Sequence, residues 1–343
     1  MRRKVKMATT IRQVAAAAGV SVATASRALS GSDAVVPVTR DRVLRVASDL
    51  DYTPSRLGRS LATGSTGNIG VILPDVTNPF YTGFLAALES AVAERDIGVL
   101  VGDSHETPEL ERRLIQRMAG QVDTLVLASS RLGDEAVVAA SARLPVVLAN
   151  RMLEAATPVP ARLRQITIDV EPGFSAAVRH LHALGHRAIT YIDGPAHSWS
   201  GRQKAQALTR TCAQLDLPLT TVAMTRPDFE GGRAALARIV PQRGGARWDV
   251  PRAIIAFNDQ VALGLLSALR DAGWDVPGDV SVIGCDDSLP TGMAWPALTT
   301  VDSSSRTLGA LAAAAVLEPD APRSATVQTR LIVRDSTGRA VAG

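Results

Sequence analysis

The chain is poor in cysteine and in aromatic residues, and it contains no long apolar run. Its two cysteines cannot build a disulfide scaffold and are typical of a reducing compartment. Aromatic residues make up 3% of the chain, so a core must consist of Ala, Val, Leu and Ile. No run of about 18 apolar residues is present to cross a membrane, and the basic N-terminus lacks the apolar stretch of a signal peptide. We therefore expect a cytoplasmic protein without a membrane partner.

Motifs for catalysis and metal binding are also missing. The sequence has no G-x-S-x-G, P-loop or H-E-x-x-H motif, and its glycines lack the dinucleotide-binding spacing. His180, His182 and His186 lie close in sequence, but the first two point to different faces of a helix. Gly185 is expected to end that helix before His186. We therefore expect no enzyme activity, no metal site and no cofactor.

Positive charge is concentrated at the N-terminus. Residues 1–64 hold eleven Lys and Arg and four Asp, a net charge of +7, which leaves −3 on the rest of a chain whose total is +4. A basic segment on a mildly acidic body is typical of a module that binds polyanions. A solvated basic tail is the alternative, because residues 2–6 supply four of these charges. The segment keeps +3 without them.

From Asn68 onward, short apolar runs alternate with amphipathic stretches of helical period. Runs such as NIGVILP, DTLVLAS and AIIAF predict parallel strands that are buried on both faces. The number of units exceeds one sheet, so we expect an α/β protein with two doubly wound lobes. A polar run over 64–67 separates this part from an N-terminal group of short helices.

The stretch TIRQVAAAAGVSVATASRALSG has the spacing of a helix-turn-helix. Gly19 is expected to form the turn and Ser21 to cap the second helix, 22–29. A third helix is expected from a Thr39 cap to about Leu50, with Asp41 in its first turn. A small helical bundle with ordinary surface hydroxyls is the alternative, which the local positive charge disfavours.

This stretch resembles the DNA-binding headpiece of the LacI/GalR family of bacterial transcription regulators. The similarity continues through PVTRDRVLRVASDLDYTPSRLGRSLATG. It resumes in the motifs NIGVILPDVTNPFY, HLHALGHRAITYIDGP, AFNDQVALGLLSAL, VPGDVSVIGCDD and PALTTVD. These motifs follow the family's order and spacing over almost the whole chain.

The resemblance implies a helix-turn-helix headpiece over 1–53, a hinge helix and linker over 54–67, and a two-lobed core over 68–343 that resembles periplasmic binding proteins. Each lobe is expected to be discontinuous in sequence. The implied boundaries are about 68–167 and 298–321 for lobe 1, and about 168–297 and 322–337 for lobe 2.

The resemblance also implies a double-stranded DNA operator of pseudo-palindromic sequence, with the second helix in the major groove. The implied DNA contacts are Thr10, Ser21, Val22, Ala23, Thr24, Ser26, Arg27, Ser55 and Leu61. Hydroxyls such as Ser21, Thr24 and Ser26 suit phosphate oxygens, and Arg27 suits a guanine edge or a phosphate. Val22 and Ala23 match the base-reading positions but reach only thymine methyls, which leaves more discrimination to Arg27 and to DNA deformability. Leu61 matches the hinge leucine that wedges into the minor groove.

A small-molecule effector is implied in the cleft between the lobes, where the carboxyl ends of the strands meet. The implied effector contacts are Asp75, Asn78, Phe80, Tyr81, Asn150, Arg202, Lys204, Asn258 and Asp286. A carboxylate such as Asp286 accepts two hydroxyl hydrogen bonds, and an aromatic ring suits the C–H face of a sugar, so a carbohydrate is expected. The family's effector-binding arginine matches either Arg202 or Lys204, and the sequence leaves both open.

The sequence thus predicts a homodimeric transcriptional regulator, specifically a repressor, whose effector changes lobe orientation and hinge pairing. A coupling of about 1–3 kcal/mol would switch operator occupancy. Whether the effector weakens or strengthens DNA binding, and whether dimers form tetramers, stays open. A periplasmic-type solute-binding protein is the alternative, which the fused helix-turn-helix and the missing signal peptide disfavour.

Overall fold

The computed structural model describes residues 9–52, 64–224, 226–239, 251–290, 293–318 and 320–340. The chain divides into two compact units, Met1–Thr66 and Gly67–Gly343. In the described part of the chain, no helix is both long and apolar enough to cross a bilayer.

The first unit contains three helices, α1 (Ile11–Ala18), α2 (Val22–Leu29) and α3 (Pro37–Asp49). Gly19 ends α1 with a φ of 64°, the left-handed conformation that glycine adopts without strain. Small side chains let the helices approach closely around Val14 and Val43, which are fully buried. The helix-turn-helix spacing therefore forms as the sequence predicts.

The start of α3 differs from the expected one. The helix begins at Pro37, two residues before the predicted Thr39 cap, and Val36 is the cap residue. Proline is favoured at the first helical position because its missing N–H would have no partner there. Asp41 consequently lies beyond the first turn of α3.

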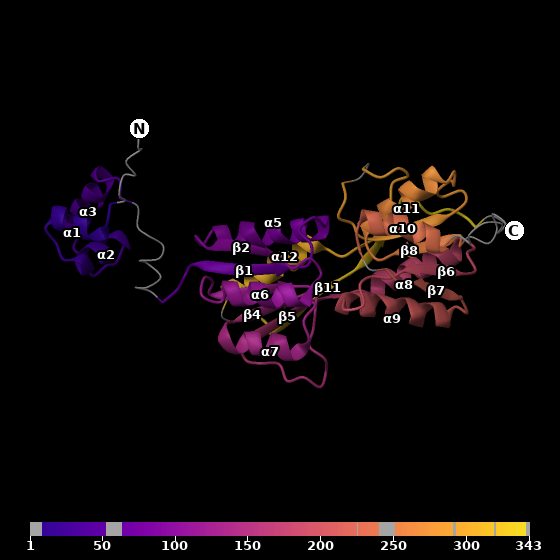
Figure 1. Ribbon diagram of the computed structural model, residues 1–343, viewed down its shortest axis with the longest axis horizontal. Helices are drawn as coiled ribbons and strands as arrows, with labels where there is room; N and C mark the ends of the chain where they lie inside the picture. The colour runs from indigo at the N-terminus through magenta and orange to yellow at the C-terminus, as the bar shows by residue number, and fades with distance from the viewer. Residues whose placement is uncertain are drawn as a thin grey trace. The chain divides into compact units, whose positions relative to one another are not determined.

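The second unit contains two six-stranded sheets, each covered by helices on both faces (Figure 1). The first sheet is parallel throughout, in the order β11 (Ser324–Gln328), β5 (Leu163–Asp169), β4 (Val146–Ala149), β3 (Thr124–Ala128), β1 (Asn68–Leu73) and β2 (Gly98–Asp103). The second sheet has the order β12 (Arg330–Ile332), β10 (Thr299–Asp302), β9 (Ser281–Asp286), β8 (Ala253–Ala256), β6 (Ile189–Ile192) and β7 (Leu219–Val222). In it only β12 is antiparallel to its neighbour.

Successive side chains of a strand point to opposite faces of its sheet, so each face packs against its own set of helices. Ile69 and Val71 of β1 pack with the helices α5 (Pro79–Ala93) and α12 (Ser305–Leu317), whereas Ile72 packs on the opposite face. That opposite face carries α6 (Pro108–Met118) and α7 (Asp134–Arg143). The second sheet has α8 (Glu171–Ala183) and α9 (Trp199–Gln214) on one face, and α10 (Phe229–Ile239) and α11 (Asp259–Asp271) on the other.

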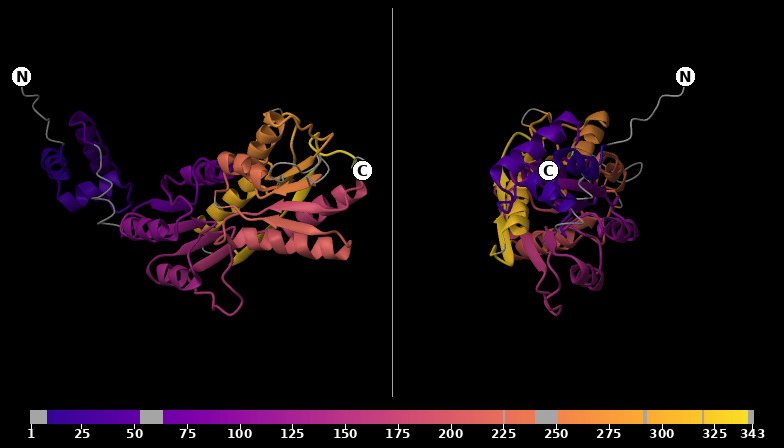
Figure 2. Two further views of the ribbon diagram at one scale, coloured as in Figure 1. Left: turned by 45° about the vertical axis from the view of Figure 1, so that its right-hand side comes forward. Right: turned by 90° about the vertical axis from the view of Figure 1, so that its left-hand side faces the viewer.

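The chain crosses between the two sheets three times, after β5, after β10 and after β11. Consequently C-terminal segments, yellow in Figure 2, occur in both lobes. The predicted lobe boundaries are wrong at two strands, because β10 belongs to the second sheet and β11 pairs with β5 in the first. The two strands exchange sheets relative to the prediction: β10 stays beside β9, the strand before it in sequence, whereas β11 pairs with the distant β5.

Candidate functional site

In the first unit, the N-terminal end of α2 is exposed. Ser21 Oγ accepts a hydrogen bond from Thr24 N at 3.1 Å and lies 2.8 Å from Thr24 Oγ1, which caps the helix. Val22, Ala23 and Arg27 are exposed on the same helix. The N-terminal end of α2 therefore presents two small apolar side chains, and Arg27 stands one turn further along the helix.

Most of the residues predicted to contact DNA are described. Thr10 is exposed at the start of α1, where its backbone N–H donates to Gln13 Oε1 at 2.8 Å, and Ser26 is half-buried on α2. Ser55 and Leu61, predicted for the hinge, lie outside the described residues.

In the second unit, a small cavity lies between the carboxyl ends of the two sheets. Its volume is about 20 Å³, which is room for about one water molecule. Both lobes contribute to its lining, which comprises Asn78, Phe80, Tyr81, Asn150, Ile168, Val170, Ser200, Lys204, Phe257, Asn258, Asp286 and Ser303. Seven of the nine predicted effector contacts are among these residues.

Lys204 is the cation of this cavity. It is 6% exposed on α9, donates from Nζ to Phe257 O at 2.8 Å, and lies 4.3 Å from the centre of the Phe257 ring. Burial lowers the pKa of Lys204, but the neighbouring Cys285 and Asp286 raise it by more, so the pKa stands above its usual value. The ammonium group therefore stays charged at neutral pH.

Asp286 is the carboxyl group of the cavity, at the end of β9. Its Oδ1 accepts a hydrogen bond from Cys285 Sγ at 3.4 Å. Burial raises the pKa of Asp286, and the charge of Lys204 opposes that rise. Burial raises the pKa of the Cys285 thiol to about 12, so this neighbour is uncharged at neutral pH.

Asn150 follows β4 and offers a free acceptor. Its Nδ2 donates to Ser129 Oγ at 3.0 Å, while its buried Oδ1 has no hydrogen-bond partner among the described residues. Asn150 and Asp286 both have positive φ, 57° and 114°, although neither is glycine. Strained backbone of this kind concentrates at functional sites.

Asp75 and Arg202 are the two predicted effector contacts that do not line the cavity. Asp75 Oδ1 instead accepts hydrogen bonds from Thr77 N at 2.8 Å and Thr77 Oγ1 at 2.6 Å, which closes a local turn. The Arg202 side chain is 47% exposed and lies 3.5 Å from Glu154. Of the two candidates for the arginine position, Lys204 is therefore the one at the cavity.

Comparison with known proteins finds a separate family match within each of the two units. A family model described as bacterial regulatory proteins, lacI family, matches residues 10–55, and one described as a periplasmic binding protein-like domain matches residues 178–337. The chain is 30% identical to catabolite control protein A of Priestia megaterium, over 89% of this chain and 91% of that protein. The chain belongs to the LacI/GalR family of bacterial transcription regulators.

Solved structures of LacI/GalR regulators have the same architecture. The lac repressor dimer, bound to operator and the anti-inducer ONPF, matches with a TM-score of 0.82 and 25% identity over 96% of this chain and 99% of that one. The complex of the regulator CelR with cellobiose matches with a TM-score of 0.64 and 27% identity, with the same coverage. The chain is thus a DNA-binding transcription regulator with the two-lobed α/β core of its family.

Sequence reasoning missed five residues that line the cavity of this LacI/GalR regulator: Ile168, Val170, Ser200, Phe257 and Ser303. Phe257 stands directly between an apolar run and Asn258, so its place at a strand end was visible in the sequence. Ser303 gave no such signal, because β10 was assigned to the other lobe.

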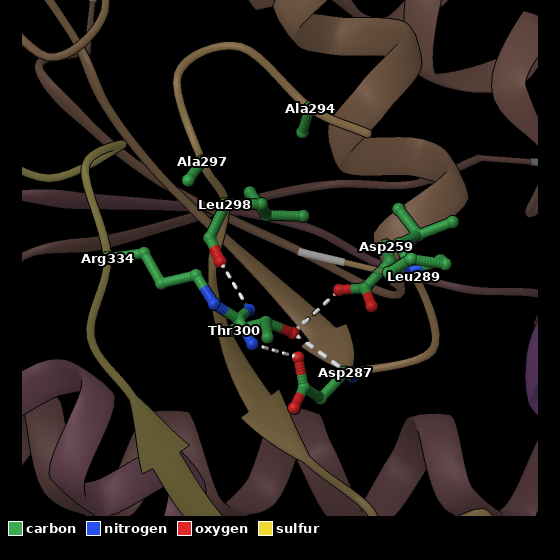
Figure 3. A pocket seen from close by; sticks show the side chains of 9 residues that line it. Asp259, Asp287, Leu289, Ala294, Ala297, Leu298, Thr300 and Arg334 are labelled. Carbon is green, nitrogen blue, oxygen red and sulfur yellow. Dashed lines mark hydrogen bonds and ion pairs between the residues drawn. The ribbon is translucent and has the colours of Figure 1, made fainter. Parts of the chain in front are cut away.

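A second cavity of about 10 Å³ lies wholly within lobe 2 (Figure 3). Thr300 Oγ1 donates to Asp259 Oδ1 at 2.6 Å, and Arg334 pairs with Asp287 at 2.6 Å. The polar side chains of its lining hydrogen-bond to one another, which is typical of a structural network. Of these two cavities, the one at Lys204 and Asp286 is lined by both lobes, and it is therefore the candidate ligand site of this family member.

Proposed function

We propose that this regulator is a repressor that binds a pseudo-palindromic operator as a homodimer and responds to a carbohydrate in the cavity between its lobes. The observation that carries this proposal is the cavity itself, because residues of both lobes supply its polar groups in a chain that also has an exposed recognition helix. The operator is proposed to contact α2 and the hinge residues Ser55 and Leu61. We place this activity in the cytoplasm, where the DNA is.

The relatives support the choice of partners. The lac repressor was solved as a dimer on its operator, and CelR was solved with cellobiose. In this chain, an acceptor at Asn150, a carboxyl group at Asp286 and an ammonium at Lys204 surround one small volume. Such a mixture of donors and acceptors beside aromatic rings suits a sugar, so we propose binding rather than catalysis. Because that small volume holds only about one water molecule, the proposed sugar requires the two lobes to move apart.

Exposed apolar side chains support self-association. Trp295 is 91% exposed and Met293 is 70% exposed, both in the segment between β9 and β10. Exposed tryptophan is rare on monomers and is enriched at the centres of interfaces. We propose that this segment contributes to the dimer.

Contacts between the lobes give the proposed ligand a means of control. Gln260 Nε2 on α11 donates to Thr77 O of the other lobe at 3.3 Å, and Arg202 of α9 pairs with Glu154 at 3.5 Å. A ligand held by both lobes favours the lobe arrangement that it fits best, and it shifts the equilibrium by its difference in affinity. We propose that this shift changes how two hinge segments meet on DNA.

Operator binding by the full-length protein tests the proposal. Retardation of a duplex from its own upstream promoter is expected, and one or more sugars should change it. Leu61→Ala should lower specific affinity while salt-sensitive, non-specific binding persists. An unchanged ratio of specific to non-specific affinity would remove the wedge role, and a protein that retards no promoter duplex under any condition would overturn the proposal.

A further inference from the structure

A buried lysine in a ligand cavity is commonly read as a receptor for phosphate or carboxylate, but the surroundings of Lys204 argue otherwise. We propose that the cavity selects neutral polyhydroxyl ligands and excludes phosphorylated or acidic ones. This inference rests on the proposed function, because it takes the cavity between the lobes as the effector site.

The ammonium group of Lys204 shares the cavity with a carboxyl group and already has a hydrogen-bond partner. Asp286 lines the same cavity, and one of the three Lys204 donors is used by Phe257 O at 2.8 Å. An anion placed beside Lys204 would therefore also meet the Asp286 carboxylate and the unpartnered Asn150 Oδ1. Both oxygens repel an anion, and a single cation with a carboxyl group beside it does not offset the removal of a phosphate from water.

At the helix N-termini beside the cavity, a side-chain cap already occupies one of the backbone N–H groups that an anion would need. Helices α5, α9 and α11 all begin at or beside it, and free N–H groups there would form a phosphate site. Each helix is instead capped by its own side chain. The three caps are Asn78 Oδ1 on Phe80 N at 3.0 Å, Ser198 Oγ on Gly201 N at 3.1 Å, and Asn258 Oδ1 on Val261 N at 2.9 Å.

The buried arginines of lobe 1 near this edge are also paired. Arg131 forms two hydrogen bonds with Glu106, at 2.5 and 3.0 Å, and Arg151 pairs with Asp134 at 2.6 Å. A guanidinium that is paired in this way would have to give up its carboxylate partner to form the same bidentate pair with a ligand carboxylate or phosphate. The described cations around the cavity therefore leave it close to neutral.

The open acceptors require a ligand that donates hydrogen bonds. Asp286 has about four lone-pair positions, of which Cys285 and Ser303 use some, and Asn150 Oδ1 is unpartnered. Lys204, in contrast, needs an acceptor. Only a group that both donates and accepts satisfies Lys204 and Asp286 together, and a hydroxyl does this without adding charge.

Calorimetry on the full-length protein tests the selection. The probes are glucose, galactose, ribose and cellobiose, the 6-phosphates of glucose and galactose, ribose 5-phosphate, the uronic acids of glucose and galactose, and inorganic phosphate. At least one neutral sugar is expected to bind, and about tenfold or more tighter than its phosphate or acid. An anion that binds more tightly than its neutral parent, or a panel in which no neutral sugar binds, would overturn the inference.

Operator retardation in the presence of the same probes separates this inference from the proposed function. If an anionic probe binds more tightly than its neutral parent and changes the retardation of operator DNA, it contradicts the selection of neutral ligands and supports the proposed function. A neutral sugar that binds preferentially and leaves operator retention unchanged supports charge selection and contradicts the proposed function.

Asp286→Asn gives the sharper test, because it leaves Lys204 without its counter-charge. The ratio of the affinity for the neutral sugar to the affinity for its phosphate or acid is expected to fall by about tenfold or to invert. Asp75→Asn is the matched control: it removes the same charge outside the cavity, and its amide oxygen can still accept the bonds from Thr77. If Asp286→Asn does not fold, Lys204→Met should instead increase the discrimination against anions. If a folded Asp286→Asn or Lys204→Met protein kept the wild-type ratio of neutral-sugar affinity to anion affinity, the proposed selection of neutral ligands would be refuted.

Discussion

At the scale of single residues, helix geometry separates two neighbouring cations. Lys204 and Arg202 are two positions apart on α9, so their side chains point about 200° apart around the helix axis. Lys204 is consequently buried at the cavity, while Arg202 is exposed beside Glu154. Lysine lacks the two-pronged geometry of arginine and presents a point charge to the cavity.

Asp259 carries a pH-dependent part of the stability. Burial raises its pKa to about 7, and the charge of Asp286 adds to this effect. The folded protein therefore holds this proton more tightly than the unfolded chain, whose aspartates have a pKa of about 3.9. The resulting contribution to stability is complete below about pH 4 and is lost as the pH rises through about 7.

Asp259→Asn is expected to remove this dependence, since an amide does not titrate. From about pH 5 to about pH 8, the free energy of unfolding should fall by about 2 kcal/mol more in the wild type than in the variant. Urea unfolding across this range measures the difference. Because the amide also loses the hydrogen bond from Ser288 N, the comparison concerns the pH profiles and not the absolute stabilities. Parallel profiles would contradict the assignment.

At the scale of elements, close helix packing depends on small residues. Helices α5 and α12 cover the same face of the first sheet. A Cβ atom placed on Gly309 of α12 would lie 2.2 Å from Phe84 O of α5. Since real Cβ atoms do not come this close to a backbone oxygen, the two helices can pack in this way only around glycine.

Gly309→Ala is therefore expected to destabilise the second unit by about 1–3 kcal/mol, although alanine favours helices. Gly120→Ala is the control, because a Cβ there would meet nothing within 4 Å and its φ is not left-handed. Thermal unfolding of both variants compares them. Equal stabilities would show that α5 and α12 adjust without cost.

At the scale of the whole molecule, each lobe needs segments that are distant in sequence. Strand β11 returns to the first sheet beside β5, and β12 returns to the second sheet beside β10, so the three crossings tie the lobes together. A change in lobe orientation therefore bends three connections at once. This arrangement permits rotation of the lobes as bodies while each core stays intact.

Trp295→Asp is expected to weaken the proposed dimer. Because the side chain is 91% exposed, the change should leave the fold of the monomer intact while it places a charge in the interface. Light scattering should show monomers, and operator affinity should fall about 100-fold because two half-sites are no longer bound together. Val159→Asp, which alters a residue that is 40% exposed, is the matched control and should remain dimeric. A dimeric Trp295→Asp protein would exclude this surface.

The sequence by itself determined the elements and the architecture. Apolar runs, helix caps and turn glycines act over a few residues, so the helix-turn-helix at Gly19 and the alternating strands and helices are readable locally. The placement of Asn258 and Asp286 side by side also follows from local position, because the carboxyl ends of parallel strands meet at one edge of a sheet, and Asn150 stands at the same edge of the other sheet.

Only the tertiary structure decided how these elements are shared between the lobes. The position of β11 depends on pairing with β5 across a long stretch of sequence, and the turn of Asp75 toward Thr77 depends on a side-chain rotamer. The same holds for the charge balance of the cavity, since Lys204 and Asp286 come from different elements. Pairing and compensation of charge act through space, and the order of residues along the chain does not specify such distances.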